Sequence, residues 1–174
     1  MSIFTFSKNS FEGQLPGETT ILVTRKHWIF LALPLFFVFL TALLVIVLTF
    51  WLSSFSWWER FSSLWEFIVS VIFLILWNLG FYLVTMYSLN TVIITNKRII
   101  ENEQRGLFKH VINEIQLKNI QDISVKIMDF FAQLLNYGDI EIQSAGAVDK
   151  FFFNHLPHPE KIKNLIMKQK VGEI

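Results

Sequence analysis

Two long stretches of this sequence, Trp28–Trp58 and Phe67–Asn96, contain no Asp, Glu, Lys or Arg. A helix needs roughly 20 apolar residues to cross the hydrocarbon of a bilayer, because each residue rises about 1.5 Å. The apolar runs within them, Trp28–Leu52 and Phe67–Tyr87, are long enough for this. Both are apolar on every side, so neither helix could bury its surface in water. The sequence therefore predicts a hairpin of two transmembrane helices.

The charges that flank the two spans predict their orientation. Basic residues precede the first span and follow the second. The loop between the spans has one basic residue, Arg60, together with the acidic Glu59 and Glu66. Lys and Arg are enriched on the cytoplasmic side of short loops. We therefore expect a multi-pass protein of the cell membrane with both termini in the cytoplasm, and the Trp-rich linker Ser53–Glu66 on the outer interface.

The chain after the second span has the composition of a soluble domain of about 85 residues, long enough for one modest core. Alternating apolar and polar residues predict about six or seven short strands. A closing helix begins at Pro159, with an apolar stripe of Ile162, Leu165 and Ile166. The strands are expected within Thr91–Thr95, Arg98–Glu101, Leu107–Leu117, Ile123–Ile127, Ile140–Gln143 and Asp149–Asn154.

These predictions describe an α+β membrane protein, in which a small β-barrel or sandwich capped by a C-terminal helix follows the hairpin. The expected parts are a cytoplasmic N-terminal segment (1–27), the hairpin (28–88) and a cytoplasmic domain (89–174). Thr19–Thr24 is also strand-like, so it could pair with an edge of the domain or with another chain.

Several short stretches, in this order and spacing, resemble the bacterial pleckstrin-homology (PH) domain membrane proteins of the YdbS/YdbT-like group. The stretches are Leu15–Glu18, Arg25–Trp28, Ile94–Ile100, Ile115–Val125 and Leu134–Gly146. The resemblance covers nearly the whole chain and implies a PH-like fold of seven strands and a C-terminal helix. It implies no activity, because the group has none in common that carries over to this chain.

The sequence contains no catalytic pattern. It has no cysteine, no nucleophile motif and no Gly-rich phosphate loop. His155 and His158 have a spacing that can chelate a metal on a helix, but Pro157 and Pro159 make the segment a loop. We therefore predict a protein that is not an enzyme and has no cofactor or metal. A net charge of +1 also predicts no nucleic-acid partner.

A lipid headgroup is one candidate ligand of the PH-like domain. Some PH domains hold inositol phosphates with basic residues on the first two strands, and the corresponding residues here are Lys97, Arg98, Arg105 and Lys109. Lys97 and Arg98 have a simpler interpretation as the positive flank of the second span. The last helix carries four lysines that either contact anionic lipid non-specifically or form a solvated face. They are Lys161, Lys163, Lys168 and Lys170.

Two further residues are candidates for protein contacts. Phe152 points away from the face that holds Phe151 and Phe153, so it is an exposed anchor for a partner or the membrane interface unless the chain itself covers it. Asn78 is the strongly polar side chain within the spans, and predicts a hydrogen bond to the other helix or to another subunit.

The favoured function is a membrane-anchored interaction or scaffold module at the cytoplasmic face. The alternatives are a headgroup-sensing PH domain and a non-catalytic subunit of a membrane enzyme or transport complex. The expected partners are the lipid bilayer and either an unidentified membrane protein or a second copy of the chain.

Overall fold

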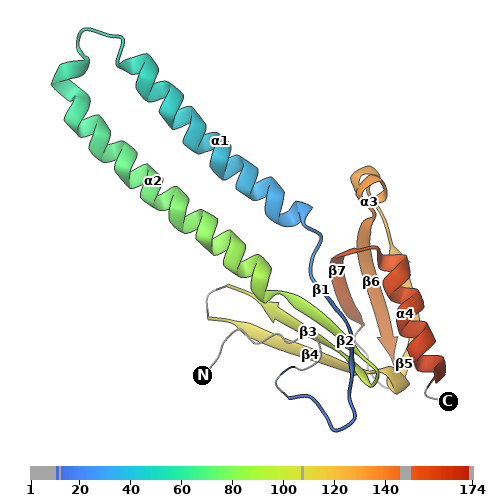
Figure 1. The fold of residues 1–174 in the computed structure, drawn as a ribbon. Helices are drawn as coiled ribbons and strands as arrows, with labels where there is room; N and C mark the ends of the chain where they lie inside the picture. The colour runs from blue at the N-terminus through green and yellow to red at the C-terminus, as the bar shows by residue number, and fades with distance from the viewer. Residues whose placement is uncertain (1–10, 12, 107, 146–149, 173–174) are drawn as a thin grey trace. The chain divides into compact units, whose positions relative to one another are not determined.

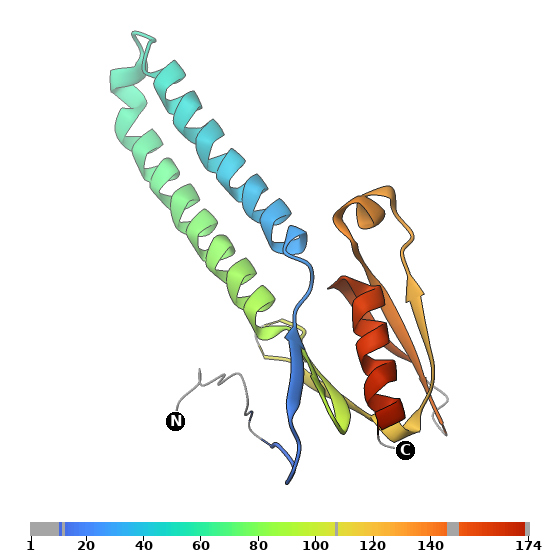
Figure 2. The ribbon, with the colours of Figure 1, turned by 45° about the vertical axis from the view of Figure 1, so that its right-hand side comes forward.

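The computed structural model describes residue 11 and residues 13–106, 108–145 and 150–172. The chain divides into two compact units, which are drawn in Figures 1 and 2. One unit is a helical hairpin, Trp28–Tyr87. The other is a domain that combines the N-terminal segment up to His27 with the chain from Ser88 onward.

The hairpin consists of α1 (Ile29–Leu52) and α2 (Trp58–Leu89), which are 24 and 32 residues long. Both helices are long and apolar enough to cross a membrane. Near the connecting turn, the indole N–H of Trp65 donates to the hydroxyl of Thr49 at 3.0 Å, which ties the two helices together. Further along, a groove of about 500 Å³ between the helices is lined by apolar side chains and Gly80.

The second helix begins earlier than its apolar run suggests. The structure starts α2 at Trp58, so most of the linker predicted for Ser53–Glu66 is helical and Ser53–Trp57 makes the turn. Charged residues in the sequence indicate where a helix leaves the hydrocarbon, but the helix itself can continue beyond them. Glu59, in the first turn of α2, is favourable beside the positive end of the helix dipole.

The domain contains seven strands in two antiparallel sheets, as expected for a PH-like fold. The first sheet has the order β1-β2-β3-β4, and its strands are β1 (Thr20–Thr24), β2 (Thr91–Thr95), β3 (Arg98–Gln104) and β4 (His110–Gln116). The second has the order β5-β6-β7, and its strands are β5 (Ile120–Lys126), β6 (Tyr137–Ser144) and β7 (Phe151–Pro157). Leu107 and Asp149, at the ends of two predicted strands, lie outside the described residues.

Strand β1 comes from the N-terminal segment. It pairs antiparallel with β2, and the register sets Thr24 opposite Val92. Segment 1–27 is therefore part of the same unit as the domain rather than a separate part, and the predicted strand Thr19–Thr24 pairs with a domain edge. The hairpin is thus an insertion between the first two strands of one sheet.

The core lies between the two sheets and is closed by α4 (Pro159–Gly172). The predicted alternation holds, since Ile123, Ile140 and Ile142 are fully buried. Ile162 and Ile166 of α4 complete the core, with Leu165 packed against it. A 3-10 turn (η1, Leu117–Asn119) and a short helix (α3, Phe130–Leu135) lie in the connections on either side of β5.

Two opposite ends of the domain matter for its function. Both chain connections to the hairpin leave from one end, where Thr24, Val92 and Glu101 stand side by side across β1, β2 and β3. We call this the junction end. The tight turn between β2 and β3, around Asn96 and Lys97, lies at the other end of the same strands, which we call the far end.

Candidate functional site

The structure does not bring the four candidate headgroup residues together. Lys97 and Arg98 lie at the far end, where β3 begins, whereas Arg105 and Lys109 follow its last residue at the junction end. A strand rises about 3.3 Å per residue, so the seven residues of β3 separate the two pairs by about 20 Å. Lys97 and Arg98 also lie away from the point where the chain leaves the second apolar helix.

At the far end, Arg98 forms a two-pronged ion pair with Glu18. Its Nε donates to Oε1 at 3.0 Å and its Nη2 to Oε2 at 3.1 Å. The Glu18 side chain is fully buried and that of Arg98 is 12% exposed. The Thr95 hydroxyl and the Leu15 N–H also donate to the same carboxylate, at 2.8 and 2.7 Å. Burial by itself raises the pKa of Glu18, but these hydrogen bonds outweigh it and hold the pKa below its ordinary value.

The remaining bonds of Arg98 hold neighbouring segments in place. Its Nη1 donates to Glu114 on β4 at 2.8 Å, and Nη2 also donates to the Gly13 carbonyl at 2.7 Å. Its guanidinium group lies 5.9 Å from the centre of the Phe11 ring. These bonds to Glu18 and Glu114 raise the pKa of Arg98. These bonds use four of the five N–H donors of the guanidinium group, so Arg98 serves mainly to hold the domain together.

A second set of bonds joins the same two segments. The Thr19 N–H donates to the Asn96 side chain at 2.8 Å, and Asn96 donates back to the Gly17 carbonyl. The ammonium group of Lys97 donates to the Pro16 carbonyl at 2.7 Å. Gly17 has φ +71°, which a residue with a side chain rarely adopts. We call segments Leu15–Glu18 and Thr95–Arg98 together the N-terminal clamp.

At the junction end, the charges around Arg105 are also paired. Arg105 lies 2.7 Å from Glu103, and its N–H donates to the Lys109 carbonyl to close the β3–β4 connection. Nearby, Lys126 and Lys150 both contact the Glu141 carboxylate. Hydrogen bonds from Lys126 and Lys150 hold the pKa of Glu141 below its ordinary value. These pairs reduce the positive charge that an anionic headgroup would meet.

A crevice of about 420 Å³ opens between β3 and β7 towards the junction end. Its lining residues are Lys26, Glu101, Glu103, Arg105, Asn113, Lys150, Phe151, Phe152 and Asn154. Phe152 is 51% exposed, while Phe153 is buried in the core, as strand alternation predicted. The described chain therefore leaves Phe152 uncovered, in the wall of a crevice that carries both signs of charge.

Glu101 is the carboxylate whose environment in this crevice is the least favourable for its charge. The side-chain amide of Asn113 donates to it at 3.0 Å. Burial raises the pKa of Glu101 above its ordinary value, and the nearby Glu103 adds to the effect, while Asn113, Lys26 and Arg105 oppose it. Residues with pKa values raised in this way gather at functional sites. Sequence analysis did not single out Glu101, because burial of an alternating polar position cannot be seen in a strand pattern.

Most of the candidate lysines of α4 lie on its outer side. Lys161 and Lys168 are exposed and Lys163 is half-buried. Lys170 differs, since its ammonium group donates to the Ile120 carbonyl at 2.6 Å. It therefore anchors the end of α4 to β5.

The histidines lie at the junction end of the domain. The N–H of His27 donates to the carbonyl of His155 at 2.7 Å, and the His27 ring lies 5.3 Å from that of Tyr137. Burial lowers the pKa of His27, and the neighbouring His158 adds to this. Among the described residues, no group of three or more His, Cys, Asp or Glu side chains could hold a metal ion.

In the hairpin, Asn78 bonds within its own helix. Its amide donates to the Leu74 carbonyl at 2.8 Å, and the side chain is exposed on the surface of the isolated chain. The predicted hydrogen bond from Asn78 to α1 does not occur among the described residues. A contact of Asn78 with another subunit stays a prediction.

Comparison with known proteins assigns the fold to a family. The family described as "Bacterial PH domain" matches residues 28–170, which include both apolar helices and six of the seven strands. The chain belongs to the bacterial PH domain family. No curated protein matches it.

Two solved structures of bacterial PH domains are similar to part of the chain. One is a DUF1696 family protein with a pleckstrin-homology domain from Shewanella loihica PV-4, with 18% identity and a TM-score of 0.39, covering 47% of this chain and 70% of that one. The other is a pleckstrin homology domain from Shewanella amazonensis SB2B, with 16% identity and a TM-score of 0.39, covering 47% and 66%.

The geometry gives a physical role to two of the motif stretches of this bacterial PH domain, one before the hairpin and one after it. Leu15–Glu18 and the Thr95–Arg98 part of Ile94–Ile100 contact each other in the N-terminal clamp. The sequence carried a signal for this contact, since an acidic residue in one motif and a basic residue in the other are complementary. Sequence analysis missed it because Lys97 and Arg98 were considered with their neighbours in the chain.

Proposed function

We propose that this bacterial PH domain protein crosses the cell membrane twice, with both termini in the cytoplasm, and acts there as a non-enzymatic interaction module for a protein partner. Two apolar helices of sufficient length and the basic flanks of the hairpin support the membrane arrangement. The domain follows α2 with Asn90 alone between Leu89 and Thr91. A linker of one residue keeps the domain close to the bilayer, so its effective concentration at the membrane surface is high.

The crevice at Phe152 is the observation that carries the partner proposal. An exposed aromatic ring beside paired charges is typical of a protein-contact site, in which aromatic anchors carry much of the binding energy. Glu101 and Glu103 disfavour an anionic headgroup there, and Arg105 is already paired with Glu103. Lys26, in the wall of the crevice, precedes α1 by only two residues, so we expect a partner that is itself in or near the membrane.

The test is site-specific photo-crosslinking in native membranes. A photoreactive phenylalanine analogue at Phe152 is compared with the same analogue at Lys163, on α4 away from the crevice. We expect a discrete protein adduct at position 152 that is absent at 163 and is lost when Glu101 and Arg105 are both replaced by Ala. Adducts to lipid alone at position 152, or the same adducts from both positions, would contradict a protein partner in the crevice.

Membrane arrangement is tested separately. The chain has no cysteine, so single substitutions can be labelled without background. A membrane-impermeant maleimide is expected to label Ser54→Cys from outside intact cells, and Lys168→Cys only after lysis. Labelling of Lys168→Cys in intact cells would overturn the proposed orientation.

A further inference from the structure

The junction end of the domain carries two exposed apolar tips, one on each side of the chain connections. The connections themselves are firmly placed within the domain. The Asn90 side chain accepts a hydrogen bond from the Gln104 N–H at 2.9 Å, and the His27 N–H donates to the His155 carbonyl at 2.7 Å. Only Trp28 separates His27 from α1, and α2 ends at Leu89, beside Asn90. Both chain connections to the apolar helices therefore leave the domain from its junction end.

The first tip is the connection between β3 and β4. The register sets Asn102 of β3 opposite Thr91, the first residue of β2, so this connection projects from the junction end. Phe108 is 99% exposed there, which is unusual for an aromatic ring in a soluble domain. It lies between Arg105 and Lys109, both basic.

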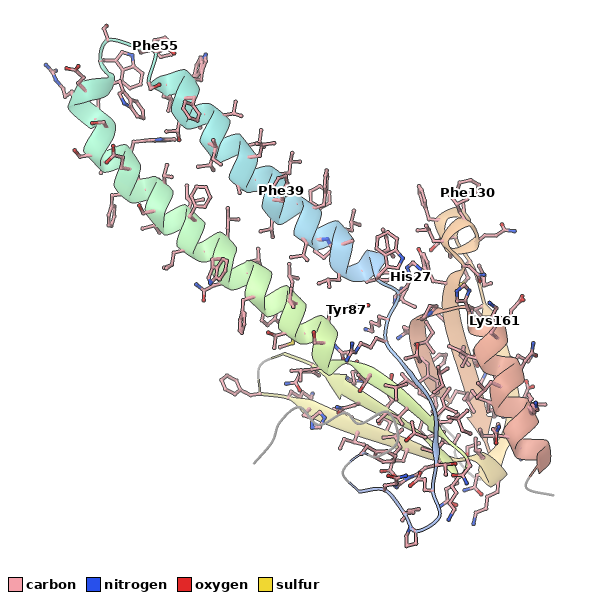
Figure 3. All side chains as sticks on the ribbon, in the orientation of Figure 1. His27, Phe39, Phe55, Tyr87, Phe130 and Lys161 are labelled. Carbon is pink, nitrogen blue, oxygen red and sulfur yellow. The ribbon has the colours of Figure 1, made fainter. Side chains whose placement is uncertain are left out.

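The second tip is α3, at the end of the β5–β6 hairpin, beyond the pair Lys126 and Asp139. Three of its side chains, those of Phe130, Phe131 and Leu134, are more than half exposed, and so is that of Met128, two residues before the helix. Ala132 is buried. Tyr137 follows α3 and its ring lies beside that of His27, and Figure 3 shows His27 and Phe130 at the same end of the domain.

The position of α3 is set by the backbone around it. Asn136 ends the helix in the left-handed conformation, with φ 55°, and its carbonyl accepts the N–H of His158 at 2.8 Å. Gly138 follows, and a Cβ there would lie 2.7 Å from the Lys126 carbonyl oxygen. The apolar side chains are thus held outward on a tightly fixed turn.

We propose that Phe108 and the α3 tip (Met128, Phe130, Phe131 and Leu134) insert into the headgroup region of the bilayer and orient the domain on it. This proposal rests on the membrane crossing proposed above, but not on the protein partner. Lipid is the expected occupant because both tips flank the two points where the chain passes into the apolar helices. Aromatic and aliphatic side chains with basic neighbours are typical of interfacial insertion.

The charged residues at the tips limit the depth of insertion. Asp129 is the only charged residue between Lys126 and Asp139, and Arg105 and Lys109 flank Phe108. Charged groups are costly in hydrocarbon, so the tips reach the interface and not the bilayer centre. The strength of binding therefore depends on the apolar area that the tips bury and on the negative charge of the lipid surface. It requires no pocket for a particular headgroup.

The experiment uses the full chain in vesicles of phosphatidylcholine and phosphatidylglycerol. An environment-sensitive fluorophore is attached to Phe131→Cys or Phe108→Cys, and to Met167→Cys as the control. Met167 is an exposed apolar residue three positions before Lys170, which is bonded to Ile120. We expect spin-labelled lipid to quench positions 131 and 108 several-fold more strongly than position 167, with blue-shifted emission at both.

Two results would overturn the proposal. One is lipid quenching at position 131 that is as weak as at position 167 while Ser54→Cys still labels from outside, which leaves the membrane crossing intact but the tips in water. The other is a blue-shifted label at 131 that lipid does not quench and that depends on protein density, which means that a second copy covers the tip. Met128→Cys provides a second probe of α3 if Phe131→Cys does not fold.

Discussion

Glu18 and Arg98 are 80 positions apart in the sequence, on either side of the helical hairpin, and form a two-pronged ion pair in which the carboxylate is fully buried. The pair links the N-terminal segment to the turn between β2 and β3. Strand β1 pairs with β2 next to it. The hairpin is therefore inserted into a domain whose two parts depend on each other.

Replacing Arg98 by Ala is expected to destabilise the domain. The change leaves the Glu18 carboxylate buried without its cation, and also removes the bonds to Gly13 and Glu114. Breaking a buried pair costs about 3–5 kcal/mol, and we expect about 2–4 kcal/mol here because Glu114 is solvent-exposed. Thermal unfolding of the purified full chain in detergent measures the loss. Arg105→Ala is the matched control, because the pair of Arg105 with Glu103 is exposed. Equal losses of stability in the two variants would contradict a stabilising role of the buried Arg98–Glu18 pair.

The domain is expected to fold without the hairpin only if the N-terminal segment is kept. Thr24 and Val92 are paired neighbours, so a short Gly/Ser linker between His27 and Leu89 can replace the helices without straining β1. We expect this fusion to be monomeric and to unfold cooperatively. Residues 89–174 alone lack β1 and leave the edge of β2 unpaired, a condition that promotes aggregation. Size-exclusion chromatography and circular dichroism compare the two, and a stable monomer of 89–174 would show that β1 is dispensable.

Much of this fold is predictable because it depends on local patterns. Apolar runs without charge predicted the two helices, alternation predicted the buried Ile123, Ile140 and Ile142, and Pro159 predicted the start of α4. Each of these signals arises from residues close together in the chain. The start of α2 at Trp58 was missed because the pattern detects the hydrocarbon boundary, whereas the helix continues beyond it.

The site was harder to predict because it depends on residues far apart in the chain. Arg98 is next to Lys97 in sequence and resembles a headgroup ligand, but its partner Glu18 comes from the other side of the hairpin. Glu101 and Phe152 line one crevice although β3 and β7 belong to different sheets. Strand alternation did predict that Phe152 lies on the face opposite Phe153, but only the structure shows that this face is left uncovered at Phe152.

Glu101→Gln is expected to stabilise the domain at neutral pH. The folded pKa of Glu101 is raised by burial, so the folded state holds its proton more tightly than the unfolded state. The unfavourable contribution of Glu101 is therefore absent at low pH and grows as the pH rises from the unfolded value through the raised folded value. The side-chain oxygen of Gln can still accept the hydrogen bond from Asn113, without the charge.

The measurement is the difference in unfolding free energy between the variant and the original protein at pH 4 and pH 7. We expect the advantage of Glu101→Gln to be larger at pH 7. Glu103→Gln, a neighbour in the same crevice, provides the control. An advantage that does not change with pH would mean that the ionisation of Glu101 does not affect stability. Crosslinking from position 152 in the Glu101→Gln variant then tests whether partner binding needs the negative charge of Glu101, which lowers the stability of the domain.

Gly138→Ala is expected to destabilise the β5–β6 hairpin and to displace α3. The new Cβ would lie 2.7 Å from the Lys126 carbonyl oxygen and 3.2 Å from a side-chain carbon of Pro159, and neither can move without shifting backbone or α4. Overpacking of this kind costs about 1–3 kcal/mol. Hydrogen exchange of the amides in β5 and β6 is expected to speed up, and a label at Phe131→Cys is expected to lose its lipid quenching. Gly80→Ala, which meets nothing within 4 Å, is the control. If Gly138→Ala leaves both the exchange and the quenching unchanged, then the tight turn does not set the position of the α3 tip.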